Sequence, residues 1–446
     1  MNPVLEPEIE LLISARWVIP VVPEGVTLAD HTVLVGNKRI QAIMPTDEAQ
    51  RRFPEANRVD LSHHVLIPGL INSHGHAAMS LFRGIADDMP LQNWLEEHIW
   101  PLESRFVSEE FVYQGTELAV AEMLRGGTTC FADMYFFPDA VARVATSANM
   151  RVQLSSPVLD FPTVWAQNPD EYIFKATELH DTYRNSELVY TAFGPHAPYT
   201  ISDAPLRKIL TLADELDIPI HMHVHETLAE VEEALQKTGK RPLQRLADLG
   251  LLSPRMVCVH ATQLLAEELD LIRKMGAHVV HCPESNLKLA SGFCPVGRLL
   301  QSGINVALGT DGCASNNDLD MISEMKTAAL LAKGVSEDAS TLPAHQALEL
   351  ATINGARALG LEDSIGSIEP GKFADLTAVR LDALHSFPQY NPVSHLVYNT
   401  QASQVSDVWI GGKSVLKQGQ LTTMEYRALQ DTAALWQQRI GGADNE

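Results

Sequence analysis

The stretch VLIPGLINSHGH, residues 65–76, decides how the rest of the chain is interpreted. It is an apolar run that ends in two histidines, His74 and His76, separated by one residue. Side chains alternate between faces along a strand, so both imidazoles would lie on one side, where they could share a metal ion. Such a pair alone is more often a polar strand end than a metal site. The remainder of the chain has to supply further ligands.

Downstream of this stretch, a pattern of strand followed by helix repeats. Candidate strands begin near residues 65, 128, 151, 189, 219, 256, 277 and 304, with helical segments between most of them. Segment 108–125 is typical, because Ser108 can cap it, acidic residues follow, and Gly126 can end it. Eight such units predict an α/β fold, a (β/α)8 TIM-like barrel. The alternative, a doubly wound open sheet, lacks its Gly-x-Gly-x-x-Gly turn.

Both ends of the chain are rich in short strands. Residues 9–64 alternate strands with turns, and residues 374–379 and 405–413 have the same texture. Neither piece has enough strands to be stable alone, so we expect them to pair into a small β-sandwich domain. The expected division is residues 1–66 and 369–446 for the sandwich, the latter with a closing helix, and residues 67–368 for the barrel.

The composition restricts the partners of the chain. Its 446 residues suffice for one large and one small domain, and its formal net charge of −23 would repel nucleic acid and anionic membranes. The five cysteines form no Cys-x-x-Cys pair, residues 1–10 are acidic, and no apolar run is long enough to span a membrane. We expect a cytoplasmic protein that acts on a small molecule, without nucleic-acid or membrane partners.

Polar residues collect at the ends of the candidate strands. The carboxyl ends of barrel strands carry the reactive groups in this architecture. The residues at these positions, beyond the first histidine pair, are His221, His223, His225, Glu226, His260, His281 and Asp311. So many independent strand ends meeting by accident is improbable, and we expect a shared site.

Several of these residues also have a plainer interpretation. We interpret His221 and His225 as packed or hydrogen-bonded histidines, and His281 as a supporting residue behind the site. His260 could simply end its strand. Asp311 precedes a glycine, where aspartate is often a turn residue.

Taken together, the motifs resemble those of the amidohydrolase superfamily. Within it they are most similar to the mononuclear branch of 5′-methylthioadenosine/S-adenosylhomocysteine deaminases and triazine hydrolases. The matching segments are PGLINSHGH at 68–76, GPHAPY at 194–199, HVHET at 223–227, HCPESNLK at 281–288 and GTDG at 309–312. The resemblance covers nearly the whole chain, and its motifs are more specific for the superfamily than for the substrate.

The resemblance implies a metal centre. Its ligands would be His74, His76, His223 and Asp311, holding one divalent ion per subunit, zinc or another such as Fe²⁺. Three neutral imidazoles and a carboxylate suit zinc and leave a position for water, whose pKa the metal lowers. The bridging lysine of binuclear relatives is absent, because the fourth strand ends at His196.

The resemblance also implies a hydrolytic deamination. Glu226 is placed like the general acid/base of the family, which takes a proton from water and gives it to a ring nitrogen. Asp311 and His260 would orient the attacking group, stabilise the tetrahedral intermediate and pass a proton to the departing ammonia. The products would be an oxo-purine and ammonia.

Besides Glu226, which would contact the purine ring, three further residues are implied as substrate contacts. Trp94 would pack against a nucleoside, Glu103 would accept hydrogen bonds from both ribose hydroxyls, and His196 would be a further contact. The alternative is an amphipathic helix with Trp94 in its core and Glu103 in solvent. Residues 153–172 contain no Lys or Arg for an amino-acid carboxylate. We therefore expect 5′-methylthioadenosine as the preferred substrate, converted to 5′-methylthioinosine, with adenosine and S-adenosylhomocysteine as alternatives.

Two other functions stay open. One is a sibling activity, the deamination of guanine or another amino-heterocycle or a triazine-type hydrolysis, which would not need the ribose contact of Glu103. The other is a non-enzymatic scaffold, although the chain keeps all four implied ligands and Glu226. The resemblance further implies a homodimer.

Overall fold

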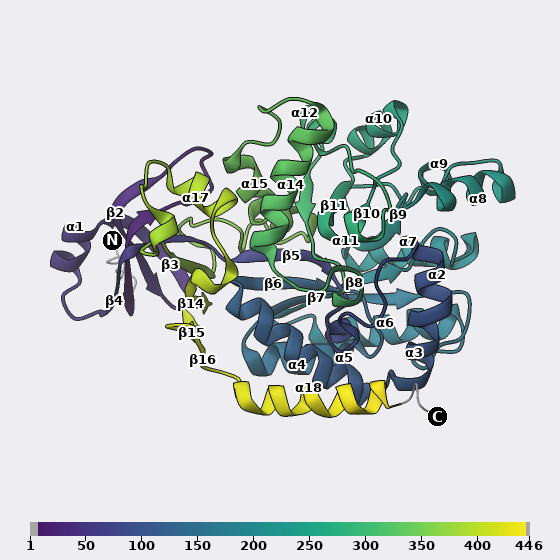
Figure 1. The fold of residues 1–446 in the computed structure, drawn as a ribbon, viewed down its shortest axis with the longest axis horizontal. Helices are drawn as coiled ribbons and strands as arrows, with labels where there is room; N and C mark the ends of the chain where they lie inside the picture. Colours follow the sequence, from purple (N-terminus) through teal and green to yellow (C-terminus); the bar gives the residue numbers. More distant parts are fainter. Residues whose placement is uncertain (1–7, 443–446) are drawn as a thin grey trace, which may run out of the picture.

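The computed structural model of the protein describes residues 8–442, which form two eight-stranded sheets (Figure 1). Most of the acidic start of the chain, residues 1–7, lies outside the described residues. One sheet is mixed and combines both chain ends, and the other is parallel and forms a nearly closed barrel. The predicted fold class, a TIM-like barrel with a small β domain from both ends, is confirmed.

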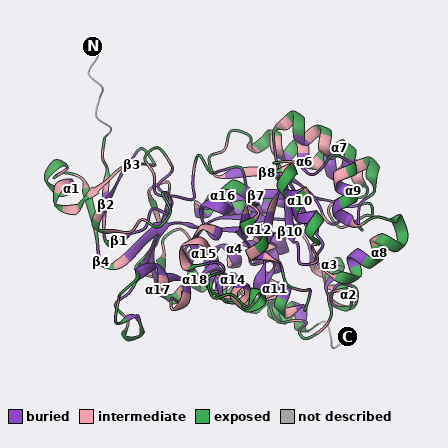
Figure 2. Ribbon diagram, turned by 90° about the horizontal axis from the view of Figure 1, so that it is seen from above, coloured by how far each residue is buried: buried purple, intermediate pink, exposed green. Residues whose placement is uncertain are grey.

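The barrel strands follow one another in chain order around the sheet. They are β5 (Leu70–Gly75), β6 (Thr128–Asp133), β7 (Arg151–Val158), β8 (Val189–Pro195), β9 (Ile220–Val224), β10 (Met256–His260), β11 (His278–His281) and β12 (Val306–Leu308). Buried residues concentrate on these strands, whereas the outer helices present exposed residues to solvent (Figure 2).

Helices lie between and around these strands. Their bounds are α2 (Leu91–Asn93), α3 (Trp100–Phe106), α4 (Glu109–Arg125), α5 (Pro138–Ala148), α6 (Pro169–Tyr183), α7 (Asp203–Leu216), α8 (Leu228–Thr238), α9 (Pro242–Asp248), α10 (Ala266–Met275), α11 (Pro283–Lys288), α12 (Val296–Gln301), α13 (Cys313–Asn316), α14 (Met321–Ser336), α15 (Ala344–Leu350) and α16 (Ile353–Ala358). As predicted, α4 begins after Ser108, whose Oγ accepts a hydrogen bond from the Phe111 N–H, and ends at Gly126. Among residues 8–442, no helix is long and apolar enough to cross a membrane.

The mixed sheet joins the two ends of the chain. Its strand order is β16-β15-β14-β13-β4-β1-β2-β3. The bounds are β1 (Leu11–Val18), β2 (Leu28–Gly36), β3 (Arg39–Pro45), β4 (Asn57–Pro68), β13 (Leu376–Arg380), β14 (Val405–Ile410), β15 (Lys413–Lys417) and β16 (Gln420–Leu421), with helices α1 (Thr46–Arg52) and α17 (Pro392–Tyr398). Strand β4 pairs parallel with β1 and antiparallel with β13, so the N-terminal and C-terminal strands meet there.

The stretch 65–76 is shared between both sheets, which corrects the expectation of a barrel strand beginning near residue 65. Residues up to Pro68 belong to β4, and the barrel begins only at Leu70. Between them, the Gly69 N–H donates to the carbonyl of Asp375, and a Cβ at Gly69 would lie 2.0 Å from Thr129 Oγ1. An apolar run shows that a segment is buried but not where it passes from one sheet to the next.

The barrel closes between β12 and β5. The Asp311 N–H donates to the His74 carbonyl at 3.0 Å. The Asn72 side chain bridges the same seam, because its Nδ2 donates to Thr310 Oγ1 at 2.7 Å and its Oδ1 accepts from the Thr310 N–H at 3.0 Å. A Cβ on Gly309 would lie 2.7 Å from the His74 nitrogen, so the strands approach this closely only with glycine there. The closure itself therefore brings Asp311 beside His74.

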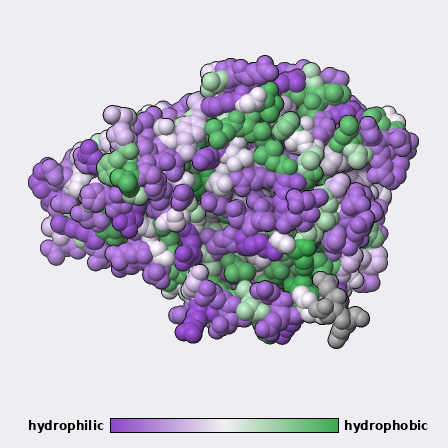
Figure 3. Space-filling model, in the orientation of Figure 1, coloured by the Kyte–Doolittle hydropathy of each residue, from purple (hydrophilic) through white to green (hydrophobic). Residues whose placement is uncertain are grey.

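The C-terminal helix α18 (Tyr426–Gly441) packs on the barrel rather than on the mixed sheet. Figure 1 shows it, in yellow, running alongside α4. The Trp436 ring meets the Phe111 ring edge to face at 5.2 Å, and its Nε1 donates to Gln114 at 2.6 Å. The face of the molecule in Figure 3 is mainly hydrophilic, in keeping with the high charge of the chain.

A buried ion pair ties the barrel to the mixed sheet. Arg151, on β7, donates from Nε and Nη2 to the Asp375 carboxylate, which directly precedes β13, at 2.5 and 3.0 Å. Both side chains are almost completely buried. The Phe373 ring lies 4.0 Å from the guanidinium carbon, and the Gly411 N–H also donates to the carboxylate. A doubly hydrogen-bonded pair of this kind satisfies two charges that would otherwise be costly to bury.

We expect Asp375→Asn to destabilise the protein, because it leaves the Arg151 guanidinium buried without its counter-charge. Breaking one side of such a pair costs about 3–5 kcal/mol of unfolding free energy. The measurement is the urea midpoint of unfolding. Asp382→Asn, in the exposed pair with Arg380, is the matched control and should cost less than about 1 kcal/mol. Equal midpoints for the two variants would contradict the importance of the buried pair.

Candidate active site

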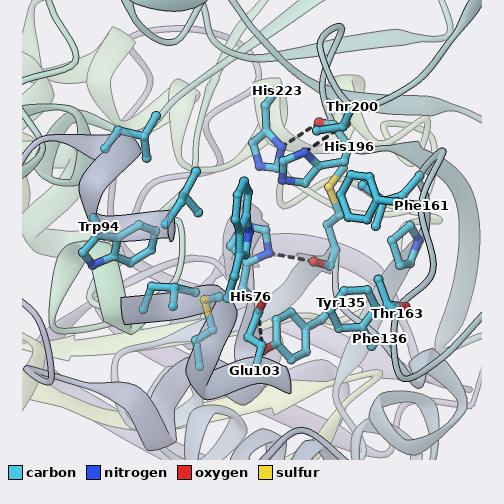
Figure 4. Close-up of a pocket in the computed structure, with 18 of the residues that line it drawn as sticks. His76, Trp94, Glu103, Tyr135, Phe136, Phe161, Thr163, His196, Thr200 and His223 are labelled. Carbon is cyan, nitrogen blue, oxygen red and sulfur yellow. Dashed lines mark hydrogen bonds between the residues drawn. The ribbon is translucent and has the colours of Figure 1, made fainter. Parts of the chain in front are cut away.

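A cavity of about 460 Å³ opens at the carboxyl ends of the barrel strands. One end is polar and is lined by His76, His196, His223, Glu226, His260 and Asp311. The rest of the lining is mainly apolar and comes from the segments after β6 and β7 and from α2, α3 and the single π-helical turn η2 (Trp94–Ile99), which lies between those two helices. Figure 4 shows Trp94 on one side of His76 and Phe161 on the opposite side. The sequence-predicted residues that line it thus come from many separate segments.

At the polar end, the structure brings together the four residues implied as metal ligands. Asp311 Oδ1 lies 3.5 Å from His74 Nε2 and 3.2 Å from His76 Nε2. His223 Nε2 lies 3.2 Å from His74 Nε2. Three histidines and one carboxylate that converge in this way through their Nε2 and carboxylate atoms form a suitable donor set for a divalent metal ion. A ring nitrogen of His260 is also close, within 4.8 Å of ligand atoms of His74 and His223.

The other nitrogen of each of the three imidazoles has a protein partner. His76 Nδ1 is 2.6 Å from the Met134 carbonyl, and His223 Nδ1 is 2.8 Å from the His196 carbonyl. His74 Nδ1 is 2.9 Å from His221 Nε2. Such bonds fix the tautomer and the ring orientation, so Nε2 of each ring stays directed at the centre. Burial, followed by neighbouring histidines, keeps the pKa of His223 well below its usual range, and the neutral form is the one a metal binds.

Two hydroxyls hold the carboxylate of Asp311. Its Oδ2 accepts from Ser285 Oγ at 2.7 Å and from Ser315 Oγ at 3.0 Å, and its Oδ1 accepts from the Gly312 N–H. Burial alone would raise the pKa of Asp311, but hydrogen bonds from His74 and His76 hold it well below its usual range. Asp311 is therefore ionised and fixed in orientation.

Glu226 and His260 face each other beside this cluster. His260 Nδ1 is 2.9 Å from Asn286 Oδ1, and its Nε2 is 3.6 Å from Glu226 Oε2. Burial raises the pKa of Glu226, while Ser291 Oγ donates to its carboxylate. The backbone of Glu226 is itself held, because its N–H donates to the Glu230 carboxylate at 2.7 Å. A raised pKa makes the carboxylate a stronger base, which favours a role in proton transfer.

The histidines interpreted as supporting residues do lie outside the cavity lining. His221 is fully buried behind His74. His225 accepts a hydrogen bond from the Leu243 N–H, and its Nδ1 lies 3.2 Å from the Gln263 carbonyl. His281 is buried, and burial lowers its pKa to about 3. His196 differs from these three, because its ring lines the cavity.

Trp94 and Glu103 both line the cavity, so the alternative of a solvated Glu103 is not what the structure shows. Trp94 is 6% exposed. Glu103 Oε1 accepts a hydrogen bond from the Tyr135 hydroxyl at 2.7 Å (Figure 4). Burial raises the pKa of Glu103 to about 7.

Sequence reasoning did not find four contributors to this site. Ser285 lies inside a matching motif, HCPESNLK, which could have pointed to it. Ser315 and Tyr135 lie in no such motif. Met134 contributes its backbone carbonyl, which no residue pattern can reveal.

We expect the double variant Ser285→Ala/Ser315→Ala to bind a divalent metal about 10- to 100-fold more weakly, because residues that orient a ligand are typically worth that much. Competition with a chelator measures this affinity. Ser302→Ala, after α12 and away from the cluster, serves as the control. Unchanged metal affinity in the double variant would show that the two hydroxyls do not support Asp311 as a ligand.

Comparisons with known proteins agree with this geometry. The family model described as "Amidohydrolase family" matches residues 65–415. A protein of Teredinibacter turnerae named 5-methylthioadenosine/S-adenosylhomocysteine deaminase is 53% identical, covering 97% of this chain and 98% of its own. A protein of the same name from Saccharophagus degradans is 51% identical, covering 97% of both chains.

A solved structure gives the same result. It is described as an adenosine deaminase from Xanthomonas campestris with bound zinc, is 51% identical, and superposes with a TM-score of 0.97 over 98% of this chain and 100% of its own. With a family model over most of its length and such relatives over nearly all of it, this chain belongs to the amidohydrolase family, in the branch of proteins named 5-methylthioadenosine/S-adenosylhomocysteine deaminase.

Proposed function

We propose that this protein is a zinc-dependent hydrolytic deaminase of adenine nucleosides, with 5′-methylthioadenosine as the preferred substrate. The observation that carries the proposal is one cavity whose lining combines a polar, metal-binding type of cluster with a mainly apolar part. Glu226 and the histidine–aspartate cluster supply its polar part, and Trp94 and Glu103 line the mainly apolar remainder. The names of the relatives support the same activity.

The residues at the polar end suit zinc. His74, His76, His223 and Asp311 would hold the ion, since imidazole nitrogens and a fixed carboxylate match its preferred donors. When bound there, zinc lowers the pKa of water and so supplies a nucleophile at neutral pH. The chain keeps these donors and Glu226 together, which argues against the scaffold alternative.

Glu226 would carry the proton that the reaction moves. Its carboxylate takes a proton from the attacking water and delivers it to a ring nitrogen of the purine, which makes the adjacent carbon electrophilic. Its raised pKa suits both steps. His260, held by Asn286, and Asp311, held by two serines, would orient the attacking group and stabilise the tetrahedral intermediate. Asp311 and His260 would then pass the remaining proton of the attacking water to the amino group, which leaves as ammonia and yields the oxo-purine.

Glu103 and Trp94 favour a nucleoside over a free base. A carboxylate offers several lone pairs, so Glu103 can accept hydrogen bonds from two neighbouring ribose hydroxyls. Trp94, almost fully buried in the wall, offers an apolar surface for the nucleoside, and His196 lines the cavity beside His223. A guanine or triazine substrate would offer no ribose hydroxyls to Glu103, which is why we rank those alternatives lower.

The far end of the cavity favours an uncharged 5′ substituent. Among the described residues that line it there is no Lys or Arg. Phe136, Leu159, Phe161 and Val164 lie there instead. Arg83, which follows the His74–His76 stretch in the sequence and could have supplied a cation, pairs with Glu122 instead and does not line the cavity. Phe161 and Val164 are partly exposed, at 43% and 45%, so an amino-acid carboxylate there would stay near solvent but would meet no cation among these lining residues. A methylthio group gains from apolar contact with them.

We expect Glu226→Gln to lower kcat for 5′-methylthioadenosine by about 10²- to 10⁴-fold, because the amide cannot carry the proton. The loss of the adenine chromophore and the release of ammonia measure turnover. Zinc content should stay near that of the unmodified protein. Glu232→Gln, exposed on α8, is the control. Full activity of Glu226→Gln would refute the assigned role.

We expect kcat/KM to be at least about tenfold higher for 5′-methylthioadenosine than for S-adenosylhomocysteine, a difference of about 1.4 kcal/mol in transition-state binding. Val164→Arg should narrow this ratio, because it supplies a cation at the apolar end. Parallel assays with adenosine and guanine complete the comparison. Equal efficiency with both thio-nucleosides would withdraw the substrate preference, and turnover of guanine alone would withdraw the nucleoside assignment.

A further inference from the structure

Two consecutive residues, Met134 and Tyr135, contact both His76 in the histidine–aspartate cluster and Glu103. The Met134 carbonyl is the hydrogen-bond partner of His76 Nδ1 at 2.6 Å. The Tyr135 hydroxyl donates to Glu103 Oε1 at 2.7 Å, and Figure 4 shows the Tyr135 and Glu103 side chains directed at each other. Both residues are 4% exposed. One short piece of backbone, residues 134–135, thus holds both His76 and Glu103 through hydrogen bonds.

That piece of backbone is firmly held. It directly follows β6, which pairs with β5 through Asp133 and Gly75. The Met134 N–H donates to the Gly75 carbonyl at 3.0 Å, and Asp133 Oδ1 accepts from the Ala77 N–H at 2.7 Å. Residues 133–135 are therefore clamped to residues 75–77, the segment that carries His76.

Glu103, by contrast, comes from outside the barrel. It lies on the two-turn helix α3, which continues from the π-helical turn η2. Its carboxylate would be free to rotate about three side-chain torsions if nothing held it. The bond from Tyr135 takes one acceptor site on Oε1 and leaves Oε2 and the remaining lone pair free for a ligand.

We propose that Tyr135 is a positioning residue for ribose recognition: it fixes the Glu103 carboxylate at a set distance from the metal end, so that both ribose hydroxyls can bind it at once. The inference rests on the proposed function. Its consequence is selectivity, because a carboxylate held in one orientation binds a ribose with both hydroxyls more tightly than a sugar with only one. Tyr135 therefore favours ribonucleosides over 2′-deoxyribonucleosides without touching the reacting atoms.

The test is Tyr135→Phe, which keeps the ring and removes only the hydroxyl. The packing of the ring against Phe136, at 5.3 Å between centroids, is retained. The zinc-loaded variant is assayed with adenosine and 2′-deoxyadenosine. We expect KM for adenosine to rise about tenfold, the effect of losing a hydrogen bond to a charged group. Neither kcat nor zinc content should change more than about twofold, and KM for 2′-deoxyadenosine should rise much less than tenfold. Tyr190→Phe, outside the cavity lining, is the control.

A double variant separates positioning from general damage. If Tyr135 acts through Glu103, then in a Glu103→Gln background the removal of the Tyr135 hydroxyl should add little, so the two effects are not additive. Unchanged selectivity between the two nucleosides in Tyr135→Phe, additive effects in the double variant, or a parallel loss of zinc would each overturn the inference. Absence of any adenine-nucleoside turnover by the unmodified protein would instead sink the proposed function itself.

Discussion

The closure of the barrel between β12 and β5 is the constraint on which the site depends. Asn72 bridges both strands through Thr310, and the Asp311 N–H reaches the carbonyl of His74. The first and last strands of the barrel are 238 residues apart at the Asn72–Thr310 contact. Because hydrogen bonds in the seam set the register, the only carboxylate of the cluster is placed beside the histidines by the fold itself. In a barrel that failed to close, Asp311 would not lie beside His74 and His76.

Around that seam, the chain fixes the orientation of each reactive group before any ligand arrives. A carbonyl holds His76, another holds His223, and His221 holds His74. Preorganised groups of this kind need not be reoriented during a reaction, which is how protein sites stabilise charge more effectively than water does. The same logic extends to the apolar end, where Tyr135 restrains Glu103.

Much of this architecture could be predicted from the sequence, because the spacing of apolar residues and the position of capping and turn residues indicate where strands and helices lie. Each barrel strand after the first was expected close to where it lies, and the helix from Glu109 was predicted from its cap. The start of the first barrel strand was misjudged, since the apolar run across Pro68 and Gly69 is equally buried in either sheet. The four residues implied as metal ligands were anticipated as a set, whereas the contacts that hold them were not. Every residue has a backbone carbonyl, so nothing in the sequence marks that of Met134 as a partner of His76. Ser315 lies in no recognised motif, so only the folded structure shows that its hydroxyl reaches Asp311.

The placement of helix α18 has a consequence for the way the protein is made. This last helix covers an apolar part of α4, including Phe111, which belongs to an early unit of the barrel. The mixed sheet likewise joins strands made first to strands made last. Domains of many proteins fold as they leave the ribosome, from the N-terminus onward. Strands β1 to β4 can pair with one another as soon as they are made, but the edge of β4 that pairs with β13 and the surface of α4 under α18 stay uncovered until the final part of the chain is made. The nascent protein therefore exposes apolar surface to which molecular chaperones can bind until translation is nearly complete.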